Sequence, residues 1–173
     1  TKEYAMPKRA FTGSCLMLFA ALAVNVARAE DVPANLALNA KVSASSQFSN
    51  EYRAEMAISG EVPSALAESG DWAVKGTQDG YFTLQWDTPI QAAQIIYYAR
   101  VTSPLLECFK DYEIFLNDGK QPVVRGVLQH RQGPQSITFP TQSVTKIHIA
   151  FLSAHPTSPN PGASEIAVYA APV

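Results

Sequence analysis

Apolar and polar residues alternate along several short segments of this chain, and no apolar pattern at helical spacing is long enough to form a layer. In the segment 81–86 (YFTLQW), Phe82, Leu84 and Trp86 share one face of a strand. The segment 111–116 (DYEIFL) alternates in the same way and leads into the tight-turn sequence Asn-Asp-Gly. Successive side chains of a strand point to opposite faces, so this pattern predicts half-buried strands.

Further segments have the composition of strands and are separated by turn residues. Residues 92–99 (AAQIIYYA) are mostly apolar, which predicts a strand buried on both faces. The remaining predicted strands are 37–45, 123–128, 136–139, 146–151 and 165–169. The only helix candidate, residues 52–58, is one or two turns long. About eight short strands at intervals of roughly 8–12 residues predict an all-β fold, either a sandwich or a barrel.

The first 29 residues have the three parts of a secretory signal. Met6 is followed by Lys8 and Arg9, then by an apolar run at 15–24, then by an Ala-Arg-Ala cleavage site that ends at Ala29. The apolar run is shorter than the stretch of about 20 residues that spans a bilayer. We therefore expect an export signal that starts at Met6, with the preceding residues as an upstream extension.

Cleavage after Ala29 divides the chain into residues 1–29, the upstream extension and signal peptide, and residues 30–173, a single domain. The mature part has nine basic and fourteen acidic residues, a formal charge of −5 (9 minus 14), which argues against nucleic acid as a partner. Cys108 is its only cysteine, so it has no intrachain disulfide, and we expect this thiol to be buried. We expect a secreted, periplasmic or cell-surface protein whose mature chain has no transmembrane segment.

Six short motifs follow one another over residues 35–170. They are 35–46 (NLALNAKVSASS), 54–60 (AEMAISG), 71–73 (DWA), 82–90 (FTLQWDTPI), 112–119 (YEIFLNDG) and 164–169 (SEIAVY). Their order resembles that of discoidin-like domains (the coagulation factor 5/8 C-type), and in particular bacterial family 32 carbohydrate-binding modules. The resemblance implies a jelly-roll β-sandwich of the galactose-binding-domain-like class and a carbohydrate partner.

The resemblance also implies a structural calcium ion, held by an Asp near an Asp-Gly element and by a Glu of the closing strand. Glu165 matches that Glu. Ser59 stands where the family has Asp, which removes an anionic ligand that Ca²⁺ favours, and Glu61 could substitute for it. Calcium binding through Glu165, Glu61 and Ser59 is therefore left open.

No catalytic motif accompanies this pattern. The sequences Gly-x-Ser-x-Gly, His-Glu-x-x-His and Gly-Lys-Ser/Thr are absent. Glu107, Asp111 and Glu113 are close in sequence, and a carboxylate pair can hydrolyse glycosides. However, Asp111 and Glu113 lie at strand spacing beside a turn, which is typical of a solvated strand. We therefore expect a binding module and no enzyme activity.

Binding is expected in loops at one end of the sandwich, since loops on a rigid scaffold commonly carry recognition. The candidate ligand-binding residues are Arg100, Glu107, Phe109, Lys110, His155 and Asn160. Arg and Asn side chains can hydrogen-bond sugar hydroxyls. The apolar face of the sugar would rest on an aromatic ring, with Phe48, Tyr52, Trp72 and Phe109 as the candidates.

Two alternatives remain open from the sequence. The resemblance implies a ligand site with a His, an Arg and an Asn, but these three residues cannot be matched one for one in this sequence. Arg100 and Glu107 could instead form a structural ion pair. The domain could also be an adhesion or interaction module that binds a protein or a lipid head group through Leu105 and Leu106, whose apolar side chains lie in an expected loop.

The signal-peptide hypothesis predicts the start of the exported product. N-terminal sequencing of that product should begin at Glu30, because the cleavage site ends at Ala29. A product that retains residues 15–24 would contradict the hypothesis and would indicate a membrane-anchored form.

Overall fold

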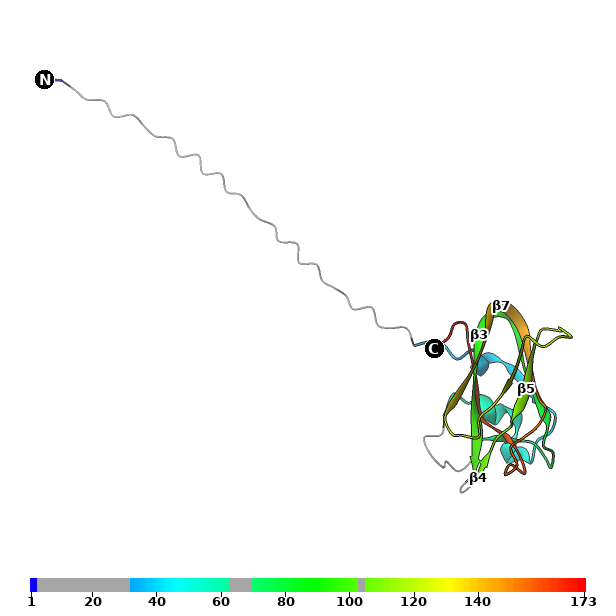
Figure 1. Cartoon of the computed structure of the whole chain (residues 1–173). Coiled ribbons are helices and arrows are strands. Elements are labelled where there is room, and N and C mark those ends of the chain that lie inside the picture. The colour runs from blue at the N-terminus through cyan, green and yellow to red at the C-terminus, as the bar shows by residue number, and fades with distance from the viewer. Residues whose placement is uncertain (3–31, 63–69, 103–104) are drawn as a thin grey trace. The chain divides into compact units, whose positions relative to one another are not determined.

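Two long antiparallel strands form the frame of this all-β fold. Strand β3 (Gly80–Thr102) and strand β7 (Pro134–Phe151) pair from one end to the other, and their register shifts twice within residues 85–94 of β3. In Figure 1 both strands bend over at the upper end of the view. Each strand therefore contributes one half to each of two layers.

The computed structural model describes residues 1–2, 32–62, 70–102 and 105–173. The expected signal peptide and its cleavage site lie outside the described residues. Val32–Val173 form one unit, and the fold below is that of this unit. In the part of the chain that is described, no helix has both the length and the apolar character to cross a membrane.

Six shorter strands complete the sandwich. In one layer, β1 pairs with the first half of β3, and β5 and β6 extend the sheet beyond β7. In the other, β8 pairs with the second half of β3, β2 pairs with β8, and β4 pairs with the end of β3. Their bounds are β1 Lys41–Ala44, β2 Trp72–Ala73, β4 Leu105–Glu107, β5 Asp111–Leu116, β6 Val124–Val127 and β8 Gly162–Tyr169. Among the described residues before β2 there are three short 3₁₀ helices, η1 Leu36–Asn39, η2 Asn50–Tyr52 and η3 Ala54–Ile58.

Aromatic side chains from both layers meet in the core. The ring of Trp72 in β2 lies 5.0 Å from that of Phe82 in β3, and the ring of Tyr97 lies 5.8 Å from that of Phe151 in β7. Phe109 stacks on Phe151 at 4.0 Å between ring centroids. All five side chains are buried. Burial of a large apolar side chain contributes about 1.5–3 kcal/mol, so this cluster holds the two layers together.

The expected all-β sandwich with about eight strands and little helix is confirmed, but several boundaries differ. Residues 81–86 and 92–99 belong to one strand, β3, because its pairing with β7 resumes in a shifted register after the exposed bend between them. Residues 136–139 and 146–151 are joined in β7 for the same reason. The first part of 37–45 is the helix η1, where the Asn35 side chain caps the N-terminus.

Cys108 is buried, as expected. Its Sγ lies 3.0 Å from the carbonyl oxygen of Phe109, and burial raises the pKa of the thiol to about 11. The thiolate is the reactive form of cysteine, so this side chain behaves as a small core residue.

Gly162 is required where β8 pairs with β2. A Cβ atom at this position would lie 1.8 Å from the carbonyl oxygen of Trp72. Gly162→Ala should therefore separate the two strands and lower the free energy of unfolding by about 1–3 kcal/mol, measured by urea denaturation.

Gly119→Ala is the matched control for this substitution. Gly119 lies in an exposed turn, where the nearest atom to the added Cβ would be 3.0 Å away. Equal stability losses in the two variants would contradict the proposed close approach of β2 and β8.

Candidate functional site

A buried arginine lies at the end of β3 and joins four other segments of the chain. The Nη1 atom of Arg100 forms an ion pair with Glu107 of β4 and donates to the carbonyl oxygen of Asn160 at 3.4 Å. Its Nε atom lies 3.6 Å from Oδ2 of Asp71. The ring of Tyr52 covers the guanidinium at 4.9 Å. We call these five residues the Arg100 cluster.

The antiparallel pairing of β3 with β4 brings the central ion pair together. Arg100 and Glu107 are directly opposite each other in the register, so their side chains leave the same face of the ladder. The Glu107 carboxylate also accepts from the Thr102 hydroxyl at 3.0 Å and from the backbone N–H of Asn160 at 2.9 Å. Glu107 therefore ties the loop that contains Asn160 to β4.

Arg100 is a buried positive charge that stabilises the fold through its ion pairs with Asp71 and Glu107. Its side chain is 7% exposed, and the side chains of Asp71 and Glu107 are 6% and 4% exposed. Burial raises the pKa of Asp71 to about 6, although the Arg100 charge opposes this shift. Removing the arginine would leave two buried carboxylates without their partner, at a cost of about 3–5 kcal/mol.

An exposed aromatic side chain, Phe48, borders this cluster. Phe48 is 46% exposed, and its ring meets the ring of Tyr52 edge to face at 5.7 Å between centroids. The Asn160 side chain is half-buried, and its Oδ1 accepts from the Gly76 N–H at 3.4 Å. We call Phe48, Tyr52 and Asn160 the loop-end surface, because all three come from connections between strands.

The structure brings three of the predicted ligand-binding residues together, namely Arg100, Glu107 and Asn160. The alternative of a structural ion pair between Arg100 and Glu107 is confirmed. The prediction that the Phe109 ring contacts a sugar is wrong, because this side chain is completely buried and stacks on Phe151.

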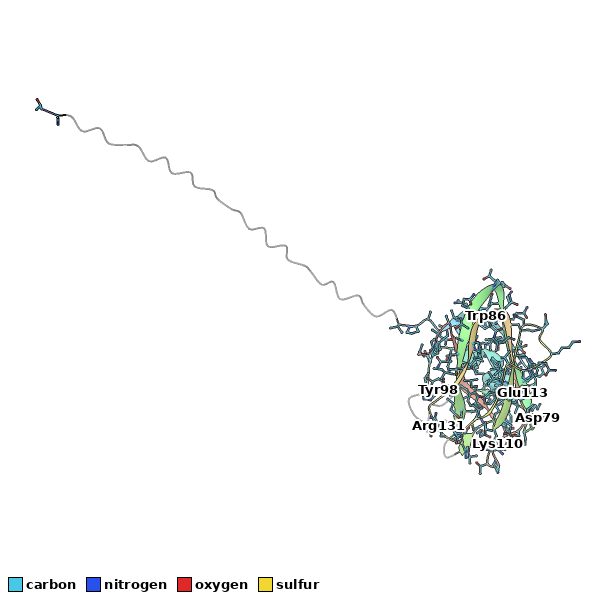
Figure 2. All side chains as sticks on the ribbon, turned by 45° about the horizontal axis from the view of Figure 1, so that its top comes forward. Asp79, Trp86, Tyr98, Lys110, Glu113 and Arg131 are labelled. Carbon is cyan, nitrogen blue, oxygen red and sulfur yellow. The ribbon has the colours of Figure 1, made fainter. Side chains whose placement is uncertain are left out.

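The other two candidates lie outside the Arg100 cluster. Lys110 is exposed, with Nζ 3.9 Å from Oδ2 of Asp111, and Figure 2 shows it at the end of the sandwich opposite Trp86. The His155 ring stacks on His130 at 4.8 Å, and its Nε2 lies 2.9 Å from the Leu128 carbonyl oxygen. Within the described ranges, no hydrogen bond or ion pair links either side chain to the cluster.

Sequence reasoning did not identify Asp71 as a site residue. It was noted only as part of the motif Asp-Trp-Ala, whose Trp72 and Ala73 form β2. An acidic residue directly before a buried tryptophan was the available signal, since burial of the strand also buries the carboxylate. Its partner, Arg100, is distant in sequence, and no local pattern connects the two.

The carboxyl group of Glu165 is surrounded by hydrogen-bond donors. Oε1 accepts from the Asn35 amide at 3.1 Å, and Oε2 accepts from the Gly60 N–H at 3.1 Å and the Ser59 hydroxyl at 3.4 Å. Burial raises the pKa of Glu165 to about 7. The Glu61 side chain is exposed, and its backbone N–H donates to the Ser59 hydroxyl oxygen.

Ca²⁺ takes six to eight oxygen ligands, whereas here N–H and O–H groups point at the carboxylate. These contacts do not fit a calcium ion. In the part of the chain that is described, no group of three or more His, Cys, Asp or Glu side chains is arranged to hold a metal.

Comparison with known proteins gives one family and many similar structures. A family model described as "Domain of unknown function (DUF7402)" matches residues 35–169. No curated protein sequence matches the chain.

Solved structures share the fold. The family 32 carbohydrate-binding module of NanJ from C. perfringens, solved with galactose, has a TM-score of 0.65 and 18% identity, covering 79% of this chain and 98% of that chain. A second Clostridium perfringens module, solved with GalNAc-β-1,3-galactose, has a TM-score of 0.64 and 19% identity. The match covers 79% of this chain and 99% of that chain. The lectin domain of lectinolysin, solved with Lewis B antigen, has a TM-score of 0.63 and 16% identity, covering 80% and 98%. The chain therefore has the discoidin-like fold of family 32 modules.

The raised pKa of Asp71 predicts a pH dependence of stability. The folded chain binds this proton with a pKa of about 6, against an ordinary value of 3.8, so the free energy of unfolding falls as the pH rises from about 4 to about 6. At about 1.4 kcal/mol per pH unit, the contribution of Asp71 to this fall is about 2–3 kcal/mol. Asp71→Asn removes the titrating group, so the decline measured by urea denaturation should be smaller by that amount.

The matched control is Asp79→Asn, the same change at an exposed position. If the free energy of unfolding of Asp71→Asn falls with rising pH as much as that of the wild type, Asp71 is not the group that binds the proton in the folded chain.

Proposed function

The chain belongs to the family described as a domain of unknown function, DUF7402, and we propose that it is an exported, non-catalytic module that binds carbohydrate. The family description assigns no activity, so the proposal is based on the fold and on the loop-end surface. Structures with this fold include modules solved with galactose, GalNAc-β-1,3-galactose and chitotriose.

One observation carries the proposal: an exposed aromatic side chain lies beside a rigidly held polar cluster. Phe48 is 46% exposed and contacts Tyr52, and Tyr52 is held on the Arg100 guanidinium. A sugar ring has an apolar C–H side and a rim of hydroxyl groups. Phe48 offers the apolar face, while Tyr52 and Asn160 offer hydrogen-bonding groups beside it.

Arg100 acts in this proposal as a positioning residue. Its guanidinium is buried and is occupied by Glu107 and the Asn160 carbonyl, so it orients Tyr52 and the Asn160 loop. Preorganised contacts lower the entropy cost of binding, which supports a rigid loop end as a recognition surface. Lys110 and His155 would act only as contacts at the periphery of a longer glycan.

The adhesion alternative has less support from the geometry. Leu105 is 43% exposed, but Leu106 packs against the core and its carbonyl oxygen lies 2.9 Å from Nε2 of His130. Both leucines lie in strand β4 and not in the expected loop, so a membrane or protein contact here would depend on a single exposed leucine. Single exposed apolar residues are common on soluble proteins.

The proposed module binds its glycan without calcium. The Glu165 carboxyl group is held by Asn35, Ser59 and Gly60, so the loop that contains Ser59 is fixed by hydrogen bonds. Titration in EDTA and in Ca²⁺ should therefore give the same affinity and the same thermal midpoint.

Glycan binding and the Phe48→Ala variant test the function. Galactose, GalNAc-β-1,3-galactose, chitotriose and a wider glycan array are the probes, and calorimetry on the purified chain measures affinity. We expect at least one glycan to bind. Phe48→Ala should weaken binding about tenfold, equivalent to about 1.4 kcal/mol, because the apolar contact is lost.

The matched control is Tyr98→Ala, which removes a half-exposed aromatic ring from the second half of β3 and should leave affinity unchanged. Equal thermal midpoints establish that the variants are folded. A folded wild-type chain that binds no glycan would contradict the function. Liposome or protein binding that Leu105→Ser abolishes would favour adhesion instead.

A further inference from the structure

Three rings lie side by side on the outer face of the layer that contains β1, β5 and β6. Tyr81 of β3 lies 5.2 Å from His148 of β7, and Phe115 of β5 lies 6.0 Å from the same imidazole. The strand register places them there, because Thr83 and Phe115 are directly opposite His148 on either side. Tyr81 is 42% exposed, and His148 and Phe115 are half-buried.

Two adjacent hollows lie along this row and share His148. One, of about 400 Å³, is lined by Phe115, Asn117 and Lys146 among others. The other, of about 520 Å³, is lined by Tyr81, Ser45 and Lys75 among others. Binding pockets for small molecules typically measure about 300–1,000 Å³, so each hollow is large enough for a ligand group.

The polar groups around His148 are held in place. The Thr83 hydroxyl lies 2.8 Å from Nδ1 of His148, which fixes the imidazole ring. Burial, together with the Lys146 charge, lowers the pKa of His148, so the ring is neutral at neutral pH. At the adjoining turn, Oδ1 of Asn117 accepts from the Thr145 N–H at 2.9 Å.

The charges lining the hollows balance. The first hollow contains Lys146 and Asp118, which form an ion pair. The second contains Lys75 and Asp79. With a neutral His148 between them, each hollow has one positive and one negative side chain and no net charge. This balance favours a neutral, hydroxyl-rich ligand over a phosphate, a nucleic acid or an acidic peptide.

We propose that this face is a second carbohydrate-binding site, which takes a neutral oligosaccharide of two or more sugar units with one unit in each hollow. The inference rests on the proposed carbohydrate-binding function and adds a site on strands instead of loops. Tyr81 and Phe115 supply apolar contact to the sugar rings. His148, Asn117 and the two lysines supply hydrogen bonds to hydroxyl groups.

The rings of this face are other residues than Phe48, Tyr52 and Asn160, so separate substitutions can test the two surfaces. Figure 2 shows Glu113 of β5 and Asp79, which lines the second hollow, across the molecule from Tyr98. Tyr98→Ala is therefore again the matched aromatic control. Tyr81→Ala changes an exposed ring and Lys75→Ala an exposed side chain, so both variants should fold.

The experiment is a ¹⁵N-NMR titration of the chain with GalNAc-β-1,3-galactose, chitotriose and the neutral glycans that bind on an array. We expect the amide signals of Thr83, His148 and Ala150 to shift. Tyr81→Ala should weaken this binding at least about tenfold and Lys75→Ala several-fold, with no effect from Phe48→Ala or Tyr98→Ala.

The outcomes separate the two sites. Shifts confined to residues around Phe48 and Tyr52 would overturn the second site and leave the proposed function intact. Shifts confined to the sheet face would support the second site and overturn the loop-end assignment. Shifts at the face that persist unchanged in folded Tyr81→Ala and Lys75→Ala would overturn the proposal, as would the absence of shifts at either surface.

Discussion

The pairing of β3 with β7 through a shared bend is the constraint on which the rest of the structure depends. The same two strands pair on either side of the bend, although their register shifts there, so one pair of strands serves both layers. The bend turns Tyr97 of one half toward Phe151 of the other, and the aromatic core fills the space between them. The ends of β3 then determine where β4 and β1 can pair, and so where each candidate surface lies.

Burial of charge at one end of this frame explains the geometry of the loop-end surface. A buried guanidinium is tolerated only when carboxylates and carbonyls surround it, and Arg100 draws these from β4, the segment before β2 and the Asn160 loop. The same requirement limits how freely those segments can move. The aromatic pair of Phe48 and Tyr52 is thereby presented on a rigid base, although neither residue belongs to a strand.

The two candidate surfaces illustrate two ways in which a β-sandwich presents polar groups. At the loop end, side chains from separate connections converge on a buried ion pair. On the sheet face, Tyr81, His148 and Phe115 come from three neighbouring strands, and their spacing follows from the ladder itself. A rigid sheet can position a row of rings without any buried charge, which fits the balanced charges of that face.

The sequence by itself determined the fold class and much of the core. Alternation at 81–86 and 111–116 identified the buried faces of β3 and β5, and the order of motifs identified the discoidin-like sandwich. These features could be predicted because strand periodicity is local. Only the tertiary structure decided that Phe109 is core, that Asp71 joins Arg100, and that Tyr81 and Phe115 flank His148. Such contacts depend on the register and bending of strands distant in sequence, and no local pattern encodes them.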